Sequence, residues 1–184
     1  FNDVYALKPQ QLQLGFLKVL KGSHMKEMVE EYQIVYKEQE PYEVLGTKWL
    51  PYEDILRLKM VEEMVENYYN SHQFDETLDA LVSRFPSPFA FFEQLAEFYE
   101  ERHAEQRKHS RVQRYELLLA FAQKSFPEEE QSFRQLLTID YYLRERAKAR
   151  PSFAPDQAAY KEQLSEILRQ TGKQNHVEAV PVGD

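Results

Sequence analysis

Glu100 and His103 are separated by two residues in a stretch with helical periodicity. Side chains three positions apart lie on one face of a helix, and di-iron helical bundles use this spacing to hold metal. Such a site needs a second Glu-x-x-His pair and two more inward carboxylates, and the sequence has no second copy. The neighbouring positions are mostly charged, which favours a solvated helix face over a metal site.

Two charged clusters have the residue types of functional sites but a simpler explanation. Asp75, Glu76 and Asp79 suit acid–base chemistry, yet they begin a predicted helix, where acids interact favourably with the helix dipole. A basic cluster lies near a predicted helix end, where cations are favoured for the same reason. Its members are Arg102, Arg107, Lys108, Arg111 and Arg114, with His103 and His109. Both clusters therefore favour helix-end electrostatics over catalysis or nucleic-acid binding.

The run from Asp140 to Arg146 mixes aromatic and charged residues. Its arginines are suited to docking against a neighbouring domain, and they are equally suited to an exposed helix end. The sequence leaves both interpretations open.

Lys18, Lys21, Gly22 and Ser23 lie between a predicted strand and a predicted helix. In α/β barrels the loops that follow the strands bind ligands, and free N–H groups at the start of a helix suit an anion. A plain connection is the alternative, and Gly22–Met25 also matches the residues left by cleavage of a common affinity tag. These four residues are the predicted cofactor-binding residues. No catalytic residue and no metal ligand is predicted.

The elements around this turn read as half of a strand–helix unit. An apolar run over residues 11–20, bounded by Pro9 and Gly22, predicts a buried strand, and Ser23 is placed to cap a helix over residues 24–32. Two β-prone segments around Val35 and Val44 then predict a small hairpin or extended arm.

Apolar residues at helical spacing fill the rest of the chain as far as residue 172. They predict helices over residues 51–70, 74–85, 89–108, 112–126, 127–150 and 155–172, with Pro51, Pro127 and Pro155 in first turns, Ser87 as a cap and Gly172 as a stop. Residues 173–184 are expected to form a flexible tail. The predicted fold is mainly α: an irregular multi-helix domain with a short N-terminal strand–helix remnant of an α/β barrel and a small β arm.

Composition and charge reduce the number of possible functions. The chain has 184 residues and a net charge of −8, which disfavours nucleic acid as a partner. No apolar run is long enough to cross a membrane, and the start lacks the features of a signal peptide. The sequence contains no Cys, so it can form neither disulfides nor thiolate metal sites. A cytoplasmic protein is expected, and a start at Phe1 suggests part of a longer chain.

Several stretches resemble cobalamin-binding radical-SAM proteins. VYALKP at residues 4–9 and LQLGFLKVLKGS at residues 12–23 resemble the last barrel strand of that family and the turn after it. The following region resembles an uncharacterised helical domain found at the C-terminus of one branch. The stretches that carry this resemblance are PYEVL at 41–45, EMVENYYNS at 63–71, SPFAFF at 87–92 and DYYLRE at 140–145.

The resemblance implies a parent with a cobalamin-binding domain and a partial barrel, which binds S-adenosylmethionine and a 4Fe–4S cluster through a Cys-x-x-x-Cys-x-x-Cys loop. Residues 1–33 would then be the last strand and helix of the barrel, and residues 34–172 a C-terminal helical domain. Because this chain has no Cys, it cannot hold the cluster. The expectation is an accessory domain without catalysis of its own, whose partners are the upstream domains or, for the isolated chain, a second copy. A stand-alone helical interaction module and a metal-dependent helical enzyme are the alternatives.

Overall fold

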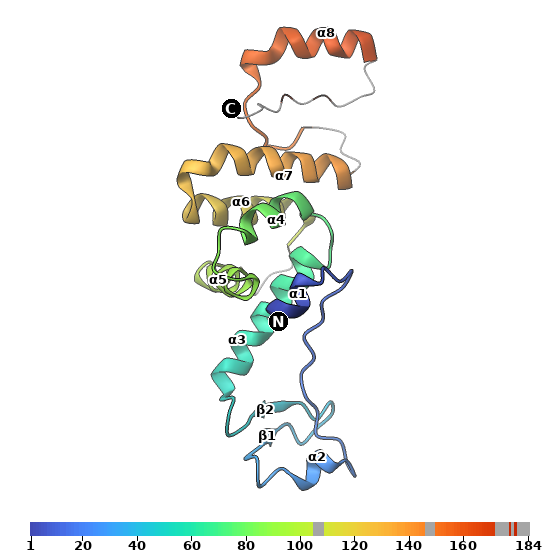
Figure 1. Ribbon diagram of the computed structural model, residues 1–184, viewed down its shortest axis with the longest axis vertical. Coiled ribbons are helices and arrows are strands. Elements are labelled where there is room, and N and C mark those ends of the chain that lie inside the picture. Colours follow the sequence, from blue (N-terminus) through green and yellow to red (C-terminus); the bar gives the residue numbers. More distant parts are fainter. Residues whose placement is uncertain (105–108, 146–149, 172–176, 178, 180–184) are drawn as a thin grey trace. The chain divides into compact units, whose positions relative to one another are not determined.

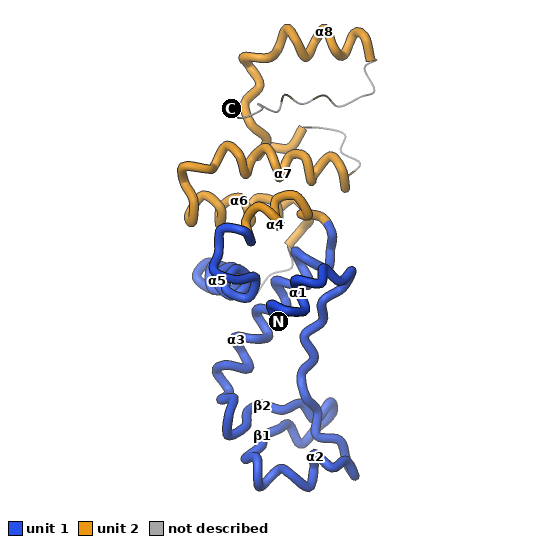
Figure 2. The backbone as a smooth tube through the Cα atoms, in the orientation of Figure 1, with its two compact units in different colours: residues 1–72, 82–107 blue, residues 73–81, 108–184 orange. Residues whose placement is uncertain are grey.

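The computed structural model describes residues 1–104, 109–145, 150–171, 177 and 179. These residues are mainly helical, with a small two-stranded antiparallel sheet, which confirms the predicted fold class (Figure 1). They form two compact units. Unit 1 comprises residues 1–72 and 82–107, and unit 2 comprises residues 73–81 and 108–184 (Figure 2). The predicted boundary between a barrel remnant (residues 1–33) and a helical domain (residues 34–172) falls inside unit 1. The assignment of residues 1–33 to a barrel stays a prediction. No helix in the described ranges has both the length and the apolar character needed to cross a membrane.

The helical part of unit 1 consists of four elements. They are α1 (Asn2–Ala6), α3 (Tyr52–Met64), a π-helical turn η1 (Val65–Tyr69) and α5 (Pro88–Glu101). Helices α3 and α5 pack together. The side chains buried in this part are those of Tyr5, Val61, Met64, Val65, Tyr68, Phe91, Phe92, Leu95, Phe98 and Tyr99. Ser87 caps α5 as predicted, because its hydroxyl accepts a hydrogen bond from the N–H of Ala90 at 3.2 Å.

The second part of unit 1 is the β arm. Strand β1 (Val35–Tyr36) pairs with β2 (Val44–Gly46), as the sequence predicted. The prediction of a strand over residues 11–20 is wrong. This stretch is extended but forms a single antiparallel bridge, between Lys18 and Glu43. Residues 17–19 pair here with residues 42–44, through hydrogen bonds from Val44 N–H to Leu17 C=O and from Val19 N–H to Tyr42 C=O.

Helix α2 (His24–Glu27) is shorter than the predicted helix over residues 24–32. The chain turns after Met28, and Gln33 adopts a positive φ of 51°, which ends any helical run. Ser23 does occupy the N-cap position, but its hydroxyl makes no cap hydrogen bond. A small apolar cluster, formed by Val19, Ile34, Val44 and Ile55, joins the arm to the first turns of α3.

Unit 2 is built from helices and short 3₁₀ turns. Residues 75–81 of α4 (Asp75–Val82) belong to it, with α6 (Arg111–Ser125), η2 (Pro127–Glu129), α7 (Glu130–Arg144), η3 (Ala158–Tyr160) and α8 (Lys161–Thr171). Helix α7 ends six residues before the predicted limit at 150, and Pro155 does not open a helix, because η3 and then α8 begin later. Gly172, the predicted stop, and most of the predicted tail lie outside the described residues.

Aromatic side chains dominate the interior of unit 2. The ring of Tyr115 lies 4.5 Å from that of Phe74 and stacks on that of Phe153 at 5.4 Å, between ring centroids. Leu118, Phe121, Phe133 and Leu137, on α6 and α7, are buried as well. Helix α6 begins with a capping box, in which Ser110 and Gln113 exchange side chain–backbone hydrogen bonds.

Candidate functional site

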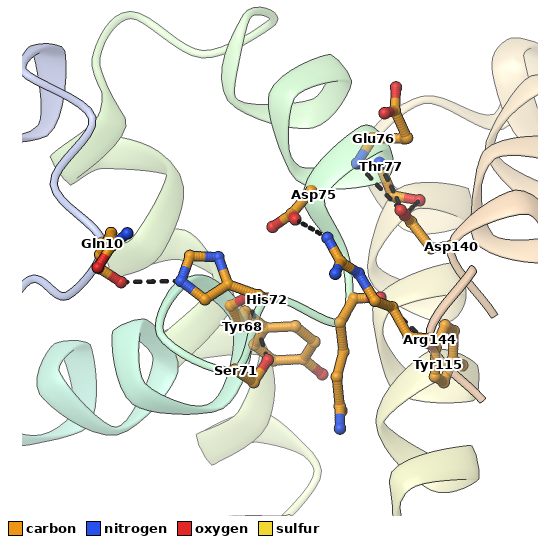
Figure 3. A network of polar contacts seen from close by, with 11 residues as sticks. Gln10, Tyr68, Ser71, His72, Asp75, Glu76, Thr77, Tyr115, Asp140 and Arg144 are labelled. Atoms are coloured by element: carbon orange, nitrogen blue, oxygen red, sulfur yellow. Dashed lines mark hydrogen bonds and ion pairs between the residues drawn. The ribbon is translucent and has the colours of Figure 1, made fainter. Parts of the chain in front are cut away.

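Three side chains of unit 1, from Tyr69, Asn70 and His72, bind the backbone of an N-terminal extended segment; we call them the backbone clamp. The amide of Asn70 accepts a hydrogen bond from Leu12 N–H at 2.8 Å and donates one to Leu12 C=O at 3.0 Å. The Tyr69 hydroxyl donates to Pro9 C=O at 2.5 Å, and His72 Nε2 lies 2.8 Å from the carbonyl oxygen of Gln10 (Figure 3). Residues 9–12 are therefore held through their main-chain atoms.

The local backbone explains how three nearby residues reach one segment. Turn η1 extends α3 with π-helical geometry, and the N–H of Asn70 bonds to the carbonyl of Val65 at 2.9 Å, five residues earlier. Val65 and Tyr68 are buried in the core of unit 1. His72 then adopts a positive φ of 52°, which ends the helical run. A π-helical turn costs backbone regularity and is frequent at functional positions, so this one marks the clamp as a candidate site.

Aromatic contacts hold the segment that precedes the clamped residues. The ring centroids of Phe1 and Phe89 lie 5.5 Å apart, and those of Tyr5 and Tyr69 lie 5.1 Å apart. The side chain of Asn2 also accepts a hydrogen bond from the N–H of Phe89 at 2.9 Å. The clamp and α1 together fix residues 1–12 to α5 and η1. Neither was predicted, although the polar residues that follow the tyrosine pair were a visible signal.

The four predicted cofactor-binding residues lie at the turn between the extended segment and α2. Lys18 is opposite Glu43, the Lys21 ammonium lies 5.8 Å from the ring centroid of Tyr42, and Gly22 makes the turn with a φ of 74°. The Ser23 hydroxyl donates a hydrogen bond to Leu20 C=O at 2.7 Å. The chain thus brings Lys21, Gly22 and Ser23 into one tight turn. A ligand for this turn stays a prediction.

An ion-pair cluster beside this turn joins three segments of unit 1. Glu43, the residue before β2, lies 2.6 Å from Lys59 of α3 and 3.4 Å from Lys37. The hydrogen bond from Lys59, with the charges of both lysines, holds the pKa of Glu43 below its usual value. The Lys59 ammonium also lies 5.2 Å from the ring centroid of Phe16, in the extended segment. This cluster was not predicted, because its members are far apart in the chain.

The predicted Glu100 and His103 pair does not share a helix face. Helix α5 ends at Glu101, and His103 lies in the turn beyond it with a positive φ of 49°. Among the described residues no group of three His, Asp, Glu or Cys side chains is placed to hold a metal ion. Arg107 and Lys108 of the predicted basic cluster lie outside the described residues.

The acidic cluster at the start of α4 has a structural role in unit 2. Asp140 of α7 accepts hydrogen bonds from the N–H groups of Glu76 and Thr77, at 3.0 and 2.9 Å, and from the Thr77 hydroxyl at 2.7 Å (Figure 3). It therefore caps α4 from another helix. Burial raises the pKa of Asp140 despite these bonds. Asp75 pairs with Arg144 at 2.5 Å, which accounts for one of the two arginines in the mixed run.

No curated protein matches the chain, and no solved structure matches it. The family model described as Protein of unknown function (DUF4080) matches residues 30–181. The match includes the β arm and the clamp residues, and it starts after the clamped segment and the Lys18–Ser23 turn. Because it covers most of the sequence, the chain belongs to the DUF4080 family.

Proposed function

We propose that the chain is the C-terminal accessory domain of a cobalamin-binding radical-SAM enzyme, and that it positions the preceding segment rather than catalysing a reaction. The backbone clamp carries this proposal. Its residues lie within the DUF4080 match, whereas residues 9–12 precede the match, so in this chain the matched region binds the segment that leads into it. A domain that packs against upstream parts of its own polypeptide needs such contacts with the segment that precedes it.

The residues of this chain fit only part of the implied cofactor chemistry. A 4Fe–4S cluster is held by thiolates, and the chain has no Cys, so the cluster does not fit here. In this proposal the upstream domains hold the cluster, S-adenosylmethionine and cobalamin. Lys18, Lys21 and Ser23 offer cations and a hydroxyl to an anionic group near the mouth of the barrel, and Gly22 provides the turn.

The test is the coding sequence upstream of Phe1, followed by the protein that it encodes. We expect an open reading frame with a Cys-x-x-x-Cys-x-x-Cys loop, and an intact protein that binds iron and sulfide after anaerobic reconstitution. A start codon directly before Phe1, with no such loop, would refute the proposal.

A stand-alone helical interaction module is the second candidate, and an exposed aromatic cluster favours it. Trp49 is 66% exposed, its ring centroid lies 5.1 Å from that of Tyr32, and the Lys48 ammonium lies 4.3 Å from the Trp49 ring centroid. Aromatic and cationic side chains of this kind are common in protein interfaces. The upstream sequence separates the two candidates, because an interaction module requires no barrel.

A further inference from the structure

The outer edge of the extended segment has free main-chain hydrogen-bonding groups. Leu17 and Val19 direct their bonds to β2, so the N–H and C=O groups of the alternate residues, Phe16 and Lys18, face away from it. Within the described residues these groups have no hydrogen-bond partner. Figure 1 shows this segment, just before α2, running beside the two strands of the arm. An open edge of this kind is a template for another strand.

Two apolar side chains near Lys18 are accessible. Leu17 is 48% exposed and Leu20 is 53% exposed. Around Gly15 the space is open, with no other heavy atom within 4 Å of the position where a side chain would begin. An apolar cavity of about 330 Å³ is lined jointly by this segment, β2 and α3, through residues such as Leu17, Val44 and Leu58. At Gly15, therefore, no side chain stands between this segment and a neighbouring backbone.

From this arrangement we propose that the isolated chain self-associates by antiparallel pairing of this edge with the same edge of a second copy. The pairing goes beyond the accessory role, since the isolated chain forms it whether or not an upstream barrel exists. A two-fold axis at Leu17 sets the two Leu17 side chains against each other. Phe16 of each copy then lies opposite Lys18 of the other, and these two residues exchange N–H to C=O bonds.

This register fits the charges and side chains of the segment. No two like charges are directly opposite, because each Lys18 faces a phenylalanine ring rather than the other lysine. The facing leucines cover surface that is exposed in the monomer.

The paired edge is short, so the association is weak. Interfaces that bury less than about 1,200 Å² are typical of transient contacts, and a ribbon of about five residues per copy falls in this class. We expect dimers only at chain concentrations of roughly 0.1–1 mM. Lys18, a charged residue on an open edge, limits further growth into larger aggregates.

The experiment combines sedimentation with hydrogen exchange measured by NMR at several chain concentrations. Exchange of the Lys18 amide should slow several-fold as concentration rises, while the Val19 amide, bonded to Tyr42 within each copy, stays protected throughout. Leu17→Lys sets like charges opposite each other and should abolish both the dimer and the concentration dependence. Leu7→Lys, at an 80% exposed position away from the edge, is the matched control and should dimerise normally.

Two outcomes would overturn the proposal. One is a chain that stays monomeric up to about 1 mM with equally fast Lys18 exchange at every concentration. The other is a dimer that survives Leu17→Lys, because such a dimer uses another surface. Protection of the Val19 amide in each variant shows that the arm is still folded, so a loss of dimer cannot be confused with unfolding. Neither outcome bears on the upstream reading frame, which tests the accessory role separately.

Discussion

The side chain of Asn70 makes the two backbone hydrogen bonds to Leu12 that a neighbouring strand would make. Its amide satisfies both the N–H and the C=O of Leu12, as a neighbouring strand would, and Leu12 is itself buried. Asn70→Ala should therefore leave two partly buried backbone groups unpaired, at a cost of about 1–3 kcal/mol. We expect much faster amide exchange at Leu12 and a lower urea midpoint. Asn67→Ala, at a half-buried position of the same turn, should change neither; equal effects of the two variants would argue against the clamp.

The charge state of Asp140 affects the stability of unit 2. Burial raises its pKa in the folded chain, so the folded state binds a proton more readily than the unfolded state. The stabilising contribution from this group is therefore complete below its unfolded pKa of 3.8 and is lost as pH rises through the folded value. The free energy of unfolding of the wild type minus that of Asp140→Asn should fall as pH rises across this window. A difference that instead rises with pH would show that the hydrogen bonds outweigh burial.

The same residue holds α4 in place by geometry as well as charge. Asp140→Ala removes the acceptor of three hydrogen bonds and leaves the N–H groups of Glu76 and Thr77 without it. We expect a loss of at least about 1–3 kcal/mol, measured by urea unfolding followed by near-UV circular dichroism. Asp156→Ala, at an exposed position in the same unit, should cost less, since only the N–H of Ala158 loses its partner.

At the scale of elements, Lys59 links α3 to Glu43, the residue before β2, and to Phe16 in the extended segment. Its bond to Glu43 contributes stability that is present above pH 4.5 and is lost as pH falls through the lowered folded pKa of Glu43. Lys59→Met keeps an apolar side chain against Phe16 but removes the charge. It should therefore reduce the loss of unfolding free energy as pH falls. Lys37→Met should have a smaller effect because its ammonium is farther from Glu43, at 3.4 Å. The free energy of unfolding of both variants is measured by chemical denaturation from pH 3 to 7.

Local signals predicted the elements whose ends are set by residues close in sequence. Ser87 and Pro88 predicted the start of α5. The apolar repeat from Ile55 to Tyr69 predicted the helical run that forms α3 and η1. The expected strand failed because pairing is decided by a partner distant in the chain: residues 42–44 pair with residues 17–19, and Asn70 binds Leu12 instead. The clamp and the Asp140 cap were hidden for the same reason, since each joins residues about 60 positions apart.

At the scale of the whole molecule, the accessory role makes a prediction about the intact protein. If the clamp fixes the segment that leads out of the barrel, loosening it should disturb catalysis without removing the cofactors. Asn70→Ala in the full-length enzyme should keep the iron content of the wild type, since the cluster ligands lie upstream in this proposal. It should slow reductive cleavage of S-adenosylmethionine several-fold, measured as 5′-deoxyadenosine formed per iron–sulfur cluster, while Asn67→Ala keeps the wild-type rate. Unchanged cleavage in Asn70→Ala would mean that the clamp serves only the stability of its own unit, and a parallel loss of iron would mean that the domain supports folding of the barrel rather than the position of its last segment.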